Sequence, residues 1–199
     1  APSKKPVGDK PPAARKPKAK PGCTEKFVGK PAKRAEVKAA LTEAAGRTYW
    51  PVSAPGLTVP LDLVKAVAWQ ESTWRSNVHS CDGGVGLMQV MPGTAKQVND
   101  RFEKAYDLNV HTDNAVLGAN YLAWLVKYYG DAYFEGNYEA KAADCASTTD
   151  MCLLNMVISA YNFGPGAVDE AADNNKALPN PGYVKNVRRL MTQCECLSF

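Results

Sequence analysis

Residues 69–92, WQESTWRSNVHSCDGGVGLMQVMP, hold most of the features that decide how this chain folds. The stretch opens at the end of an apolar run in which Leu61, Val64, Ala68 and Glu71 recur at helical spacing. Pro60 precedes this run at a position that suits the first turn of a helix. Residues 75–93 are rich in glycine, so we expect a loop there that contains one short helical piece.

The rest of the chain also predicts helices, and it shows no convincing strand alternation and no internal repeat. Gly46 and Gly130 are natural helix stops, and an apolar stripe marks the segment before Gly130 as the clearest helix. The fold class is therefore all-α or nearly so. We expect these further helices over residues 35–45, 94–105, 113–129, 152–161 and 182–192.

Charge divides the chain into a basic front and a mildly acidic body. Residues 1–34 carry 11 Lys/Arg and 2 Asp/Glu, a net charge of +9, whereas residues 35–199 carry a net charge of −5. The front is rich in Pro, Lys and Ala, a composition that stays extended and solvated. We therefore expect a disordered basic tail or linker over residues 1–34 and one domain over residues 35–199.

The tail could bind an anionic polymer of the cell wall, an anionic lipid or nucleic acid, or simply act as a solvated linker. Because no aromatic residue precedes Phe27, the tail has no platform for base stacking, and we do not expect nucleic acid as a partner. The chain has no apolar run of the length that a membrane span needs.

The six cysteines indicate an oxidising, extracytoplasmic compartment, which predicts a secreted protein. Sequence does not choose among their possible pairings, but Cys145 with Cys152 is the easiest local closure and is our predicted disulfide. A structural zinc site is the competing interpretation. It is disfavoured because the closest pair is Cys194-Glu195-Cys196 and no CxxC occurs. We expect no metal and no cofactor.

Three clusters contain residues suited to chemistry, and each also has a purely structural interpretation. A carboxyl group at Glu71 would lie beside a buried stripe, which favours its protonated form as a general acid requires, or it could point to water. Gln89 lies in an apolar run and needs partners for its amide, either a ligand or the backbone. Tyr161 and Asn162 precede Gly164-Pro165-Gly166, where they could face a cleft or serve as a core Tyr and a capping Asn.

Taken in order, the clusters resemble the catalytic domain of soluble lytic transglycosylases. These enzymes belong to the lysozyme-like superfamily and are related to goose-type lysozyme. The resemblance runs from about Asp62 to Met191. It rests on Glu71-Ser72, Ser80, Gly86-Leu87-Met88-Gln89-Val90-Met91-Pro92, Asn114 to Leu122, Ala160-Tyr161-Asn162-Phe163-Gly164-Pro165-Gly166 and Tyr183-Val184.

This resemblance implies a lysozyme-like domain that cuts the glycan strands of peptidoglycan, with Glu71 as the single catalytic acid/base. It implies cleavage of the β-1,4 bond between N-acetylmuramic acid and N-acetylglucosamine, with 1,6-anhydro ends. A monomer is expected. The implied substrate-binding residues are Ser80, Met88, Gln89, Tyr161, Asn162 and Tyr183.

The chain departs from the family pattern in three places. Phe163 stands where the family usually has a small residue, and Cys81 lies inside the substrate loop, which a disulfide could pin. Residues 131–151 look like an inserted segment that a disulfide could close.

Two alternatives remain open. One is a goose-type lysozyme-like hydrolase in which Asp82 or another acid activates water. The other is a catalytically silent protein that binds the cell wall.

Overall fold

The computed structural model describes residue 5, residues 8–13 and residues 21–199, and this part of the chain is mainly helical. The expected fold class is therefore confirmed. Two short 3₁₀ turns, η1 (Ala142–Asp144) and η2 (Glu195–Leu197), accompany the α-helices. The α-helices are α1 (Arg34–Ala45), α2 (Leu61–Ser72), α3 (Pro92–Phe102), α4 (His111–Tyr133), α5 (Leu153–Phe163), α6 (Pro165–Asp173) and α7 (Pro181–Gln193).

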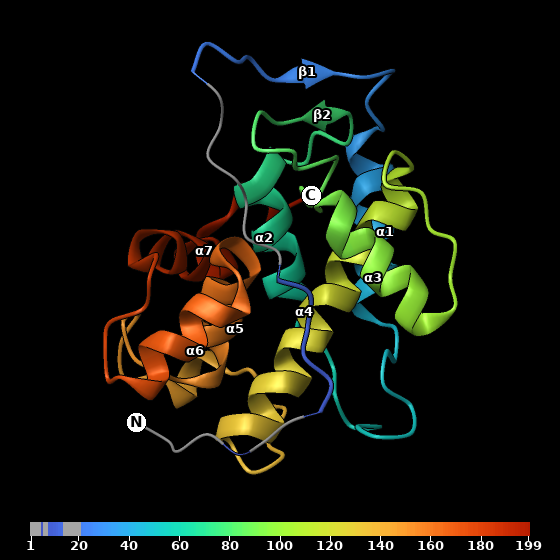
Figure 1. Cartoon of the computed structure of the whole chain (residues 1–199). Helices are drawn as coiled ribbons and strands as arrows, with labels where there is room; N and C mark the ends of the chain where they lie inside the picture. The colour runs from blue at the N-terminus through green and yellow to red at the C-terminus, as the bar shows by residue number, and fades with distance from the viewer. Residues whose placement is uncertain (1–4, 6–7, 14–20) are drawn as a thin grey trace.

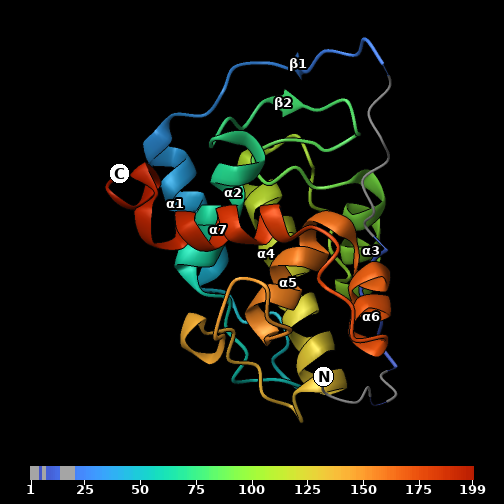
Figure 2. The same ribbon diagram turned by 90° about the vertical axis from the view of Figure 1, so that its left-hand side faces the viewer.

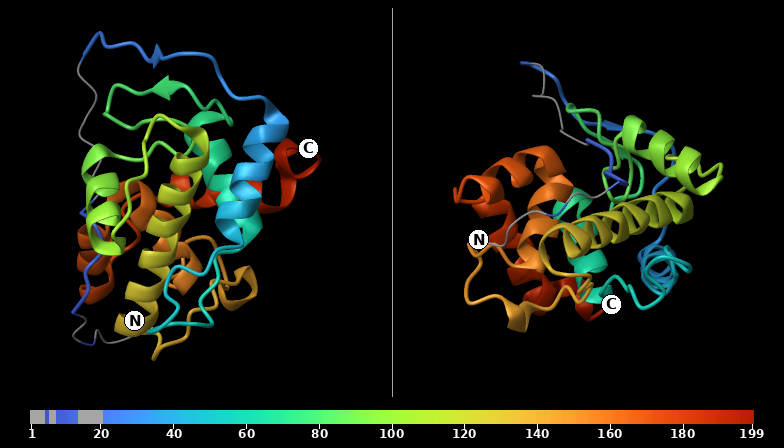
Figure 3. Two further views of the ribbon diagram at one scale, coloured as in Figure 1. Left: turned by 90° about the vertical axis from the view of Figure 1, so that its right-hand side faces the viewer. Right: turned by 60° about the horizontal axis from the view of Figure 1, so that its bottom comes forward.

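Helix α4 forms the centre of the molecule, and α1, α3 and α5 pack against it (Figure 1). Most of its residues are buried, as expected of a helix that is covered on several faces. Helix α5 also contacts α6 and α7, and α7 crosses α2 (Figure 2). Helices α1 and α3 flank α4 on opposite sides, and α2 packs against both α1 and α7 (Figure 3).

Several element bounds differ from the sequence-based expectation. Helix α4 does not stop at Gly130 but continues to Tyr133. Gly130 lies under the next loop, where a Cβ would fall 2.6 Å from Cδ1 of Tyr138 and 2.7 Å from the carbonyl oxygen of Asn137. The glycine therefore permits close packing rather than ending the helix.

The sequence predicts a turn at Gly164-Pro165-Gly166, but the helix α6 begins there instead. Gly164, at φ +91°, separates α5 from α6, and Pro165 opens α6 at the first helical position, where proline is favoured. The prediction of a short helical piece within residues 75–93 is wrong. Between α2 and α3, residues 73–91 form turns, the strand β2 (Val78–His79) and isolated bridges.

The strand β1 (Lys26–Phe27) pairs antiparallel with β2, so that Lys26 faces His79 and Phe27 faces Val78. The disulfide between Cys23 and Cys81 joins the same two segments. The expectation that a disulfide pins the loop around Cys81 is therefore confirmed. The link closes a long stretch of chain and restrains the segment just before α1 against the loop after α2.

The predicted disulfide between Cys145 and Cys152 is also confirmed, and it closes a short loop just before α5. The remaining pair is Cys194–Cys196, next to η2. Among the residues that the structure describes, no group of His, Cys, Asp and Glu side chains is arranged to hold a metal ion. In the same residues, no helix is both long enough and apolar enough to cross a membrane.

Part of the expected basic tail packs against the domain. Its residues 21–33 include β1 and Cys23, and its residues 8–13 lie on α4 (Figure 1). The prediction of disorder also covers residues 1–4, 6–7 and 14–20, and these lie outside the described residues. The division into a tail over 1–34 and a domain over 35–199 stays a prediction.

Candidate active site

Glu71 lies one residue before the end of α2, and its carboxylate faces α7. The hydroxyl of Tyr183 donates a hydrogen bond of 2.5 Å to Oε1 of Glu71. This contact exists because α7 crosses α2, which brings together residues 112 positions apart in the sequence. Both side chains are half-buried, so the pair lies at the surface of the core and not within it.

The Tyr183 hydroxyl stays protonated at pH values well above those at which a tyrosine ordinarily ionises. Burial of its hydroxyl end raises the pKa of Tyr183, and the charge of Glu71 and the hydrogen bond to it raise that pKa further. The same two influences, burial first and the Glu71 charge second, raise the pKa of Tyr161. Two phenols that remain hydrogen-bond donors therefore lie around one carboxylate.

The loop after α2 is held in place by hydrogen bonds to three helices. Ser72 donates from Oγ to the carbonyl oxygen of Leu87 at 2.6 Å, which ties the loop to α2. The hydroxyl of Tyr161, on α5, donates to the carbonyl oxygen of Met88 at 2.8 Å. Asn114, on α4, accepts from the backbone N–H of Met88 at 2.8 Å. The loop that follows Glu71 is thus fixed to α2, α4 and α5.

Asn114 is a site residue whose role was missed from the sequence. It is fully buried, and its side-chain nitrogen donates to the carbonyl oxygens of Val85, at 2.9 Å, and Leu108, at 2.8 Å. Together with the bond from Met88, these contacts satisfy the whole amide. The signal in the sequence was a polar residue in the first turn of a strongly apolar helix, where burial would demand partners.

The side chains of Met88 and Gln89 are turned into the protein. Met88 is fully buried against Gly118 of α4, where a Cβ would come within 2.8 Å of the Met88 Cβ. Gln89 donates from Nε2 to the carbonyl oxygens of Gly86, at 2.8 Å, and Val78, at 3.1 Å. The amide nitrogen of Gln89 therefore bonds to the backbone, as the structural interpretation of this residue expects.

Ser80 and Asp82 form a small capped turn in the same loop. The Ser80 hydroxyl donates to Oδ1 of Asp82, and the N–H of Gly84 donates to the same oxygen at 3.1 Å. The backbone N–H of Ser80 in turn donates to the carbonyl oxygen of Gly84 at 2.9 Å. Asp82 therefore shapes the turn, and the side chains of Ser80 and Asp82 are both partly exposed.

Asn162 lies at the end of α5 and is partly exposed. Its Oδ1 accepts a hydrogen bond of 2.9 Å from the side-chain nitrogen of Asn180, which also donates to the carbonyl oxygen of Ser159 at 3.2 Å. Asn180 immediately precedes α7 and so couples α5 to the helix that carries Tyr183. The amide nitrogen of Asn162 makes no hydrogen bond with the described part of the chain and is a donor available to a ligand.

The structure therefore links Glu71, Tyr183, Tyr161 and the backbone of Met88 directly, through hydrogen bonds and the charge of Glu71. Gln89 supports this group from within the loop, and Asn162 adjoins it through Asn180 and α5. Ser80 bonds within its own turn, and no described contact joins it to Glu71.

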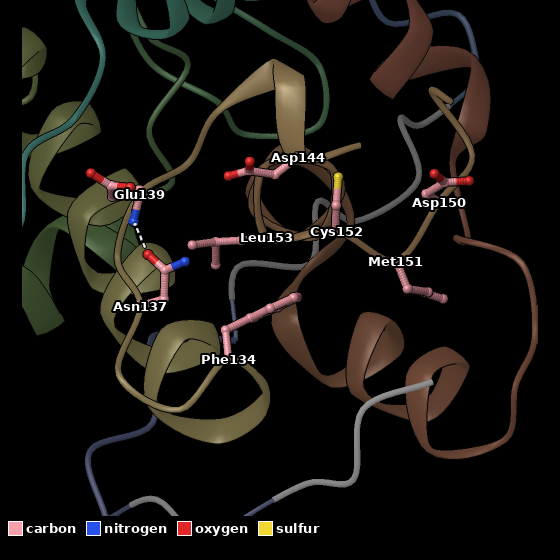
Figure 4. Close-up of a pocket in the computed structure, with 8 residues that line it drawn as sticks. All are labelled: Phe134, Asn137, Glu139, Asp144, Asp150, Met151, Cys152 and Leu153. Carbon is pink, nitrogen blue, oxygen red and sulfur yellow. Dashed lines mark hydrogen bonds between the residues drawn. The ribbon is translucent and has the colours of Figure 1, made fainter. Parts of the chain in front are cut away.

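A separate cavity of about 400 Å³ lies among the end of α4, the segment that follows it and the start of α5 (Figure 4). Its lining combines the apolar side chains of Phe134, Met151 and Leu153 with the carboxylates of Glu139, Asp144 and Asp150. None of the predicted site residues lines it. The sequence did not indicate this cavity, which depends on how the segment closed by the Cys145–Cys152 disulfide folds against α4 and α5.

The family model of the transglycosylase SLT domain matches residues 49–182, which is more than half of the chain. The chain belongs to the transglycosylase SLT domain family. The SLT match contains Glu71, the loop through Gln89 and the Tyr161-Asn162 pair, and it ends one residue before Tyr183. Residues 1–48, including Cys23 and α1, lie outside the SLT match.

Curated relatives of this SLT domain include two enteric proteins. The chain is 30% identical over 153 residues to the soluble lytic murein transglycosylase of Escherichia coli K12, covering 66% of this chain and 20% of that protein. It is 28% identical over 167 residues to the soluble lytic murein transglycosylase of Salmonella typhimurium, covering 71% and 23%. The chain thus spans about a fifth of the length of these relatives.

Solved structures with the same fold include two lytic transglycosylases. Slt from Pseudomonas aeruginosa superposes with a TM-score of 0.53 at 24% identity, over 80% of this chain and 23% of that one. The soluble lytic transglycosylase Slt70 of Escherichia coli superposes with a TM-score of 0.52 at 27% identity, over 72% and 23%. The helical arrangement around Glu71 is therefore that of an SLT domain.

Proposed function

We propose that this chain is a peptidoglycan lytic transglycosylase, with Glu71 as its catalytic acid/base. It would cleave the β-1,4 bond between N-acetylmuramic acid and N-acetylglucosamine and leave 1,6-anhydro-muramic ends. Membership of the SLT family and relatives named soluble lytic murein transglycosylases support this proposal. The single observation that carries it is the hydrogen bond from Tyr183 to Glu71, beside a loop that is fixed to three helices.

In the first step, protonated Glu71 would donate its proton to the oxygen of the leaving sugar. Most glycosidases then use a second carboxylate, but substrate-assisted families use a group of the substrate instead. The N-acetyl oxygen of the muramic acid would attack the anomeric carbon while the glycosidic bond to the protonated leaving sugar breaks, which forms an oxazolinium-like intermediate. This route suits a site in which the carboxylate of Glu71 accepts a hydrogen bond from Tyr183 and lies close enough to Tyr161 for its charge to raise the pKa of that phenol.

In the second step, Glu71 would act as a base. As a carboxylate it would accept the proton of the C6 hydroxyl of the same sugar. That hydroxyl oxygen would then bond to the anomeric carbon, while the bond to the N-acetyl oxygen breaks. The 1,6-anhydro ring closes without consuming water. Tyr183 would keep the carboxylate oriented through both steps, because its hydroxyl remains a donor to Oε1.

The other predicted site residues receive different roles in this proposal. Tyr161, Met88 and Gln89 would position the loop, because their polar groups or side chains are engaged within the protein. Ser80 and Asn162 would contact the glycan, because both side chains are partly exposed. For Asn162 the free amide nitrogen supports a bond to a sugar hydroxyl or N-acetyl oxygen.

The hydrolase alternative needs a second acid to activate water, and Asp82 is its candidate. Oδ1 of Asp82 already accepts two hydrogen bonds within its own turn. This supports a structural role for Asp82 and favours the transglycosylase proposal over the hydrolase. The silent wall-binding alternative would not require a carboxylate held by a protonated phenol.

We also propose that the chain works outside the cytoplasm, because its disulfides persist in an oxidising compartment. We further propose that it acts there as a monomer. Its net charge of +9 over residues 1–34 would add attraction to anionic wall polymers. Such attraction is screened by salt, so pelleting with purified walls should weaken as ionic strength rises. Pelleting that does not depend on salt would contradict this role of the tail.

The experiment that tests the proposed reaction is mass spectrometry of the products from purified peptidoglycan. We expect anhydro ends, which are lighter than hydrolytic ends by one water. Hydrolytic ends would contradict the proposal in favour of the hydrolase. An absence of products from the folded protein would favour the wall-binding alternative.

A further inference from the structure

Residues 8–13, the N-terminal strap, lie along α4 and cover Tyr121 and Trp124. Figure 1 shows the strap between α3 on one side and α5 and α6 on the other. The indole N–H of Trp124 donates to the carbonyl oxygen of Asp9 at 3.1 Å, and the hydroxyl of Tyr121 donates to the carbonyl oxygen of Pro12 at 3.2 Å. Pro11 and Pro12 are buried against this surface.

The strap follows α4 toward the candidate active site. The backbone N–H of Lys5 donates to the carbonyl oxygen of Ala132, near the end of α4, whereas Pro12 meets Tyr121 in its middle. These two points of α4 are about 16 Å apart at 1.5 Å per residue.

The end of the strap at Pro12 lies next to residues that contact the candidate active site. The ring of Tyr121, which bonds to Pro12, lies 5.4 Å from the ring of Tyr161. Tyr161 in turn bonds to the carbonyl oxygen of Met88 in the loop after Glu71. The surface that the strap covers is therefore continuous with the candidate active site through Tyr121 and Tyr161.

The surface under the strap combines aromatic rings with two hydrogen-bond donors. It presents the indole of Trp124, which packs edge-on against Trp50 and Phe102, and the hydroxyl of Tyr121. Aromatic faces combined with a few polar groups are typical of ligand grooves. With the strap in place, Tyr121 and Trp124 are only 2% and 4% exposed, so these groups are closed to any other ligand.

The contacts that hold the strap are few, and a ligand could replace them. The strap contributes two backbone carbonyl oxygens, two proline rings and the Asp9 carboxylate, which pairs with Arg101 of α3 at 2.8 Å. Both partners of that ion pair are substantially exposed, and exposed pairs contribute little. Proline also keeps the segment extended, which lowers the ordering needed for it to dock again.

We infer that the N-terminal strap is an intramolecular competitor of the glycan strand: it occupies the part of the glycan groove that Tyr121 and Trp124 line, and the glycan must displace it. This inference rests on the proposed function. It assigns the basic N-terminal segment a second role, control of access to the site. A chain whose strap is docked most of the time would show a raised KM and an unchanged kcat.

The test compares the full-length chain with a full-length variant that carries Asp9→Ser, Pro11→Ser and Pro12→Ser. The matched control is Lys10→Ser, an exposed position within the same strap. Turnover of soluble, un-cross-linked glycan strands gives KM and kcat, and the indole N–H signal of Trp124 in an NMR spectrum reports whether the strap is docked. We expect the triple variant to move this signal and to lower KM about fivefold or more, with kcat unchanged, if the strap is docked about four-fifths of the time. The control should match the parent.

Two further measurements keep the test independent of the triple variant. A peptide of residues 8–13, added to that variant, should raise KM again. Glycan added to the full-length Glu71→Gln chain should move the Trp124 signal in the direction seen for the triple variant. A displaced strap with an unchanged KM, or glycan that binds without moving the Trp124 signal, would overturn the inference alone. An absence of turnover in both parent and variant, without glycan binding, would overturn the proposed function and this inference with it.

Discussion

The hydroxyl of Tyr183 donates a hydrogen bond of 2.5 Å to Oε1 of Glu71, which joins α7 to the end of α2. A hydrogen bond to a charged group contributes roughly 1.5–3 kcal/mol, more than one between neutral groups. The bond also fixes the direction of the carboxylate, because the crossing of α2 and α7 leaves the phenol little freedom. If Glu71 is the acid/base, Tyr183 is its positioning residue.

Tyr183→Phe should therefore lower kcat about tenfold or more and change KM little, because about 1.4 kcal/mol corresponds to a tenfold change in rate. The phenyl ring keeps the packing of α7 on α2, so the variant should still fold, although loss of the hydrogen bond should lower its free energy of unfolding by up to roughly 1.5–3 kcal/mol. The matched control is Tyr106→Phe, which removes a phenol that accepts a hydrogen bond from Arg47 instead. Steady-state kinetics on soluble glycan strands make the comparison. An unchanged kcat in Tyr183→Phe would refute the positioning role.

Gly118→Ala should destabilise the protein although alanine is the better helix former. A Cβ at Gly118 would overlap the thioether of Met88 and approach its Cβ to 2.8 Å. Overpacking of this kind costs about 1–3 kcal/mol, whereas the gain in helix propensity is only about 1 kcal/mol. Displacing Met88 should also disturb the loop that Tyr161 holds and reduce turnover.

The control for this substitution is Gly93→Ala in α3, where a Cβ would meet nothing within 4 Å. We expect it to be neutral or slightly stabilising. Denaturant unfolding of the two variants measures the difference. Gly118→Ala that is as stable and active as Gly93→Ala would show that the loop does not depend on Met88.

How far the sequence predicts this molecule depends on whether a feature is local. The helix that ends at Glu71 follows from spacing within α2, and the Cys145–Cys152 pair follows from short loop closure. Asn114 could not be placed, because its bond to Met88 joins residues 26 positions apart. The docked strap is less predictable still, since Asp9 and Trp124 are 115 positions apart and composition alone favours a solvated tail.

For the predicted site residues, the sequence indicates which of them lie near Glu71 better than it indicates what each side chain contacts. Gln89 was expected to face either a ligand or the backbone, and its amide nitrogen bonds to backbone. Met88 is apolar, and only the close approach of Gly118 shows that its side chain points into the core. Pattern alone does not say which side of a loop is covered, because that is fixed by the helices packed against it.

Alkaline solution should unfold the protein through its tyrosines. Burial raises the pKa of seven of the nine, for example the pKa of Tyr138 to about 12, with a further contribution from Asp131. These phenols stay neutral in the folded chain but ionise near pH 10 in the unfolded chain. Their stabilising contribution is therefore complete below about pH 10 and is lost as pH rises through the folded-state pKa values.

The measurement is a titration of tyrosinate absorbance alongside circular dichroism. We expect the absorbance of these tyrosines to rise together with the loss of helical signal. Ionisation of most tyrosines near pH 10 in a chain that stays folded would be inconsistent with their burial.

Asp82→Asn separates the transglycosylase from the hydrolase. Asparagine keeps the oxygen that accepts hydrogen bonds from Ser80 and Gly84 but loses the charge. We expect turnover within about threefold of the parent, as for a change of less than about 0.7 kcal/mol. A hydrolase that uses Asp82 to activate water should instead lose about 100-fold or more. Kinetics and product masses from the same digests decide between the two.

The most direct test of the central claim is the turnover of purified peptidoglycan by Glu71→Gln. Glutamine keeps the size of the side chain and an oxygen that can accept the Tyr183 hydrogen bond, but it cannot exchange a proton. The matched control is Glu170→Gln on α6, an exposed position. With circular dichroism showing both variants folded, we expect Glu71→Gln to be slower by about 100-fold or more, because general acid and base catalysis are both removed, while Glu170→Gln keeps the parent rate. A folded Glu71→Gln protein with near-normal turnover would contradict the account.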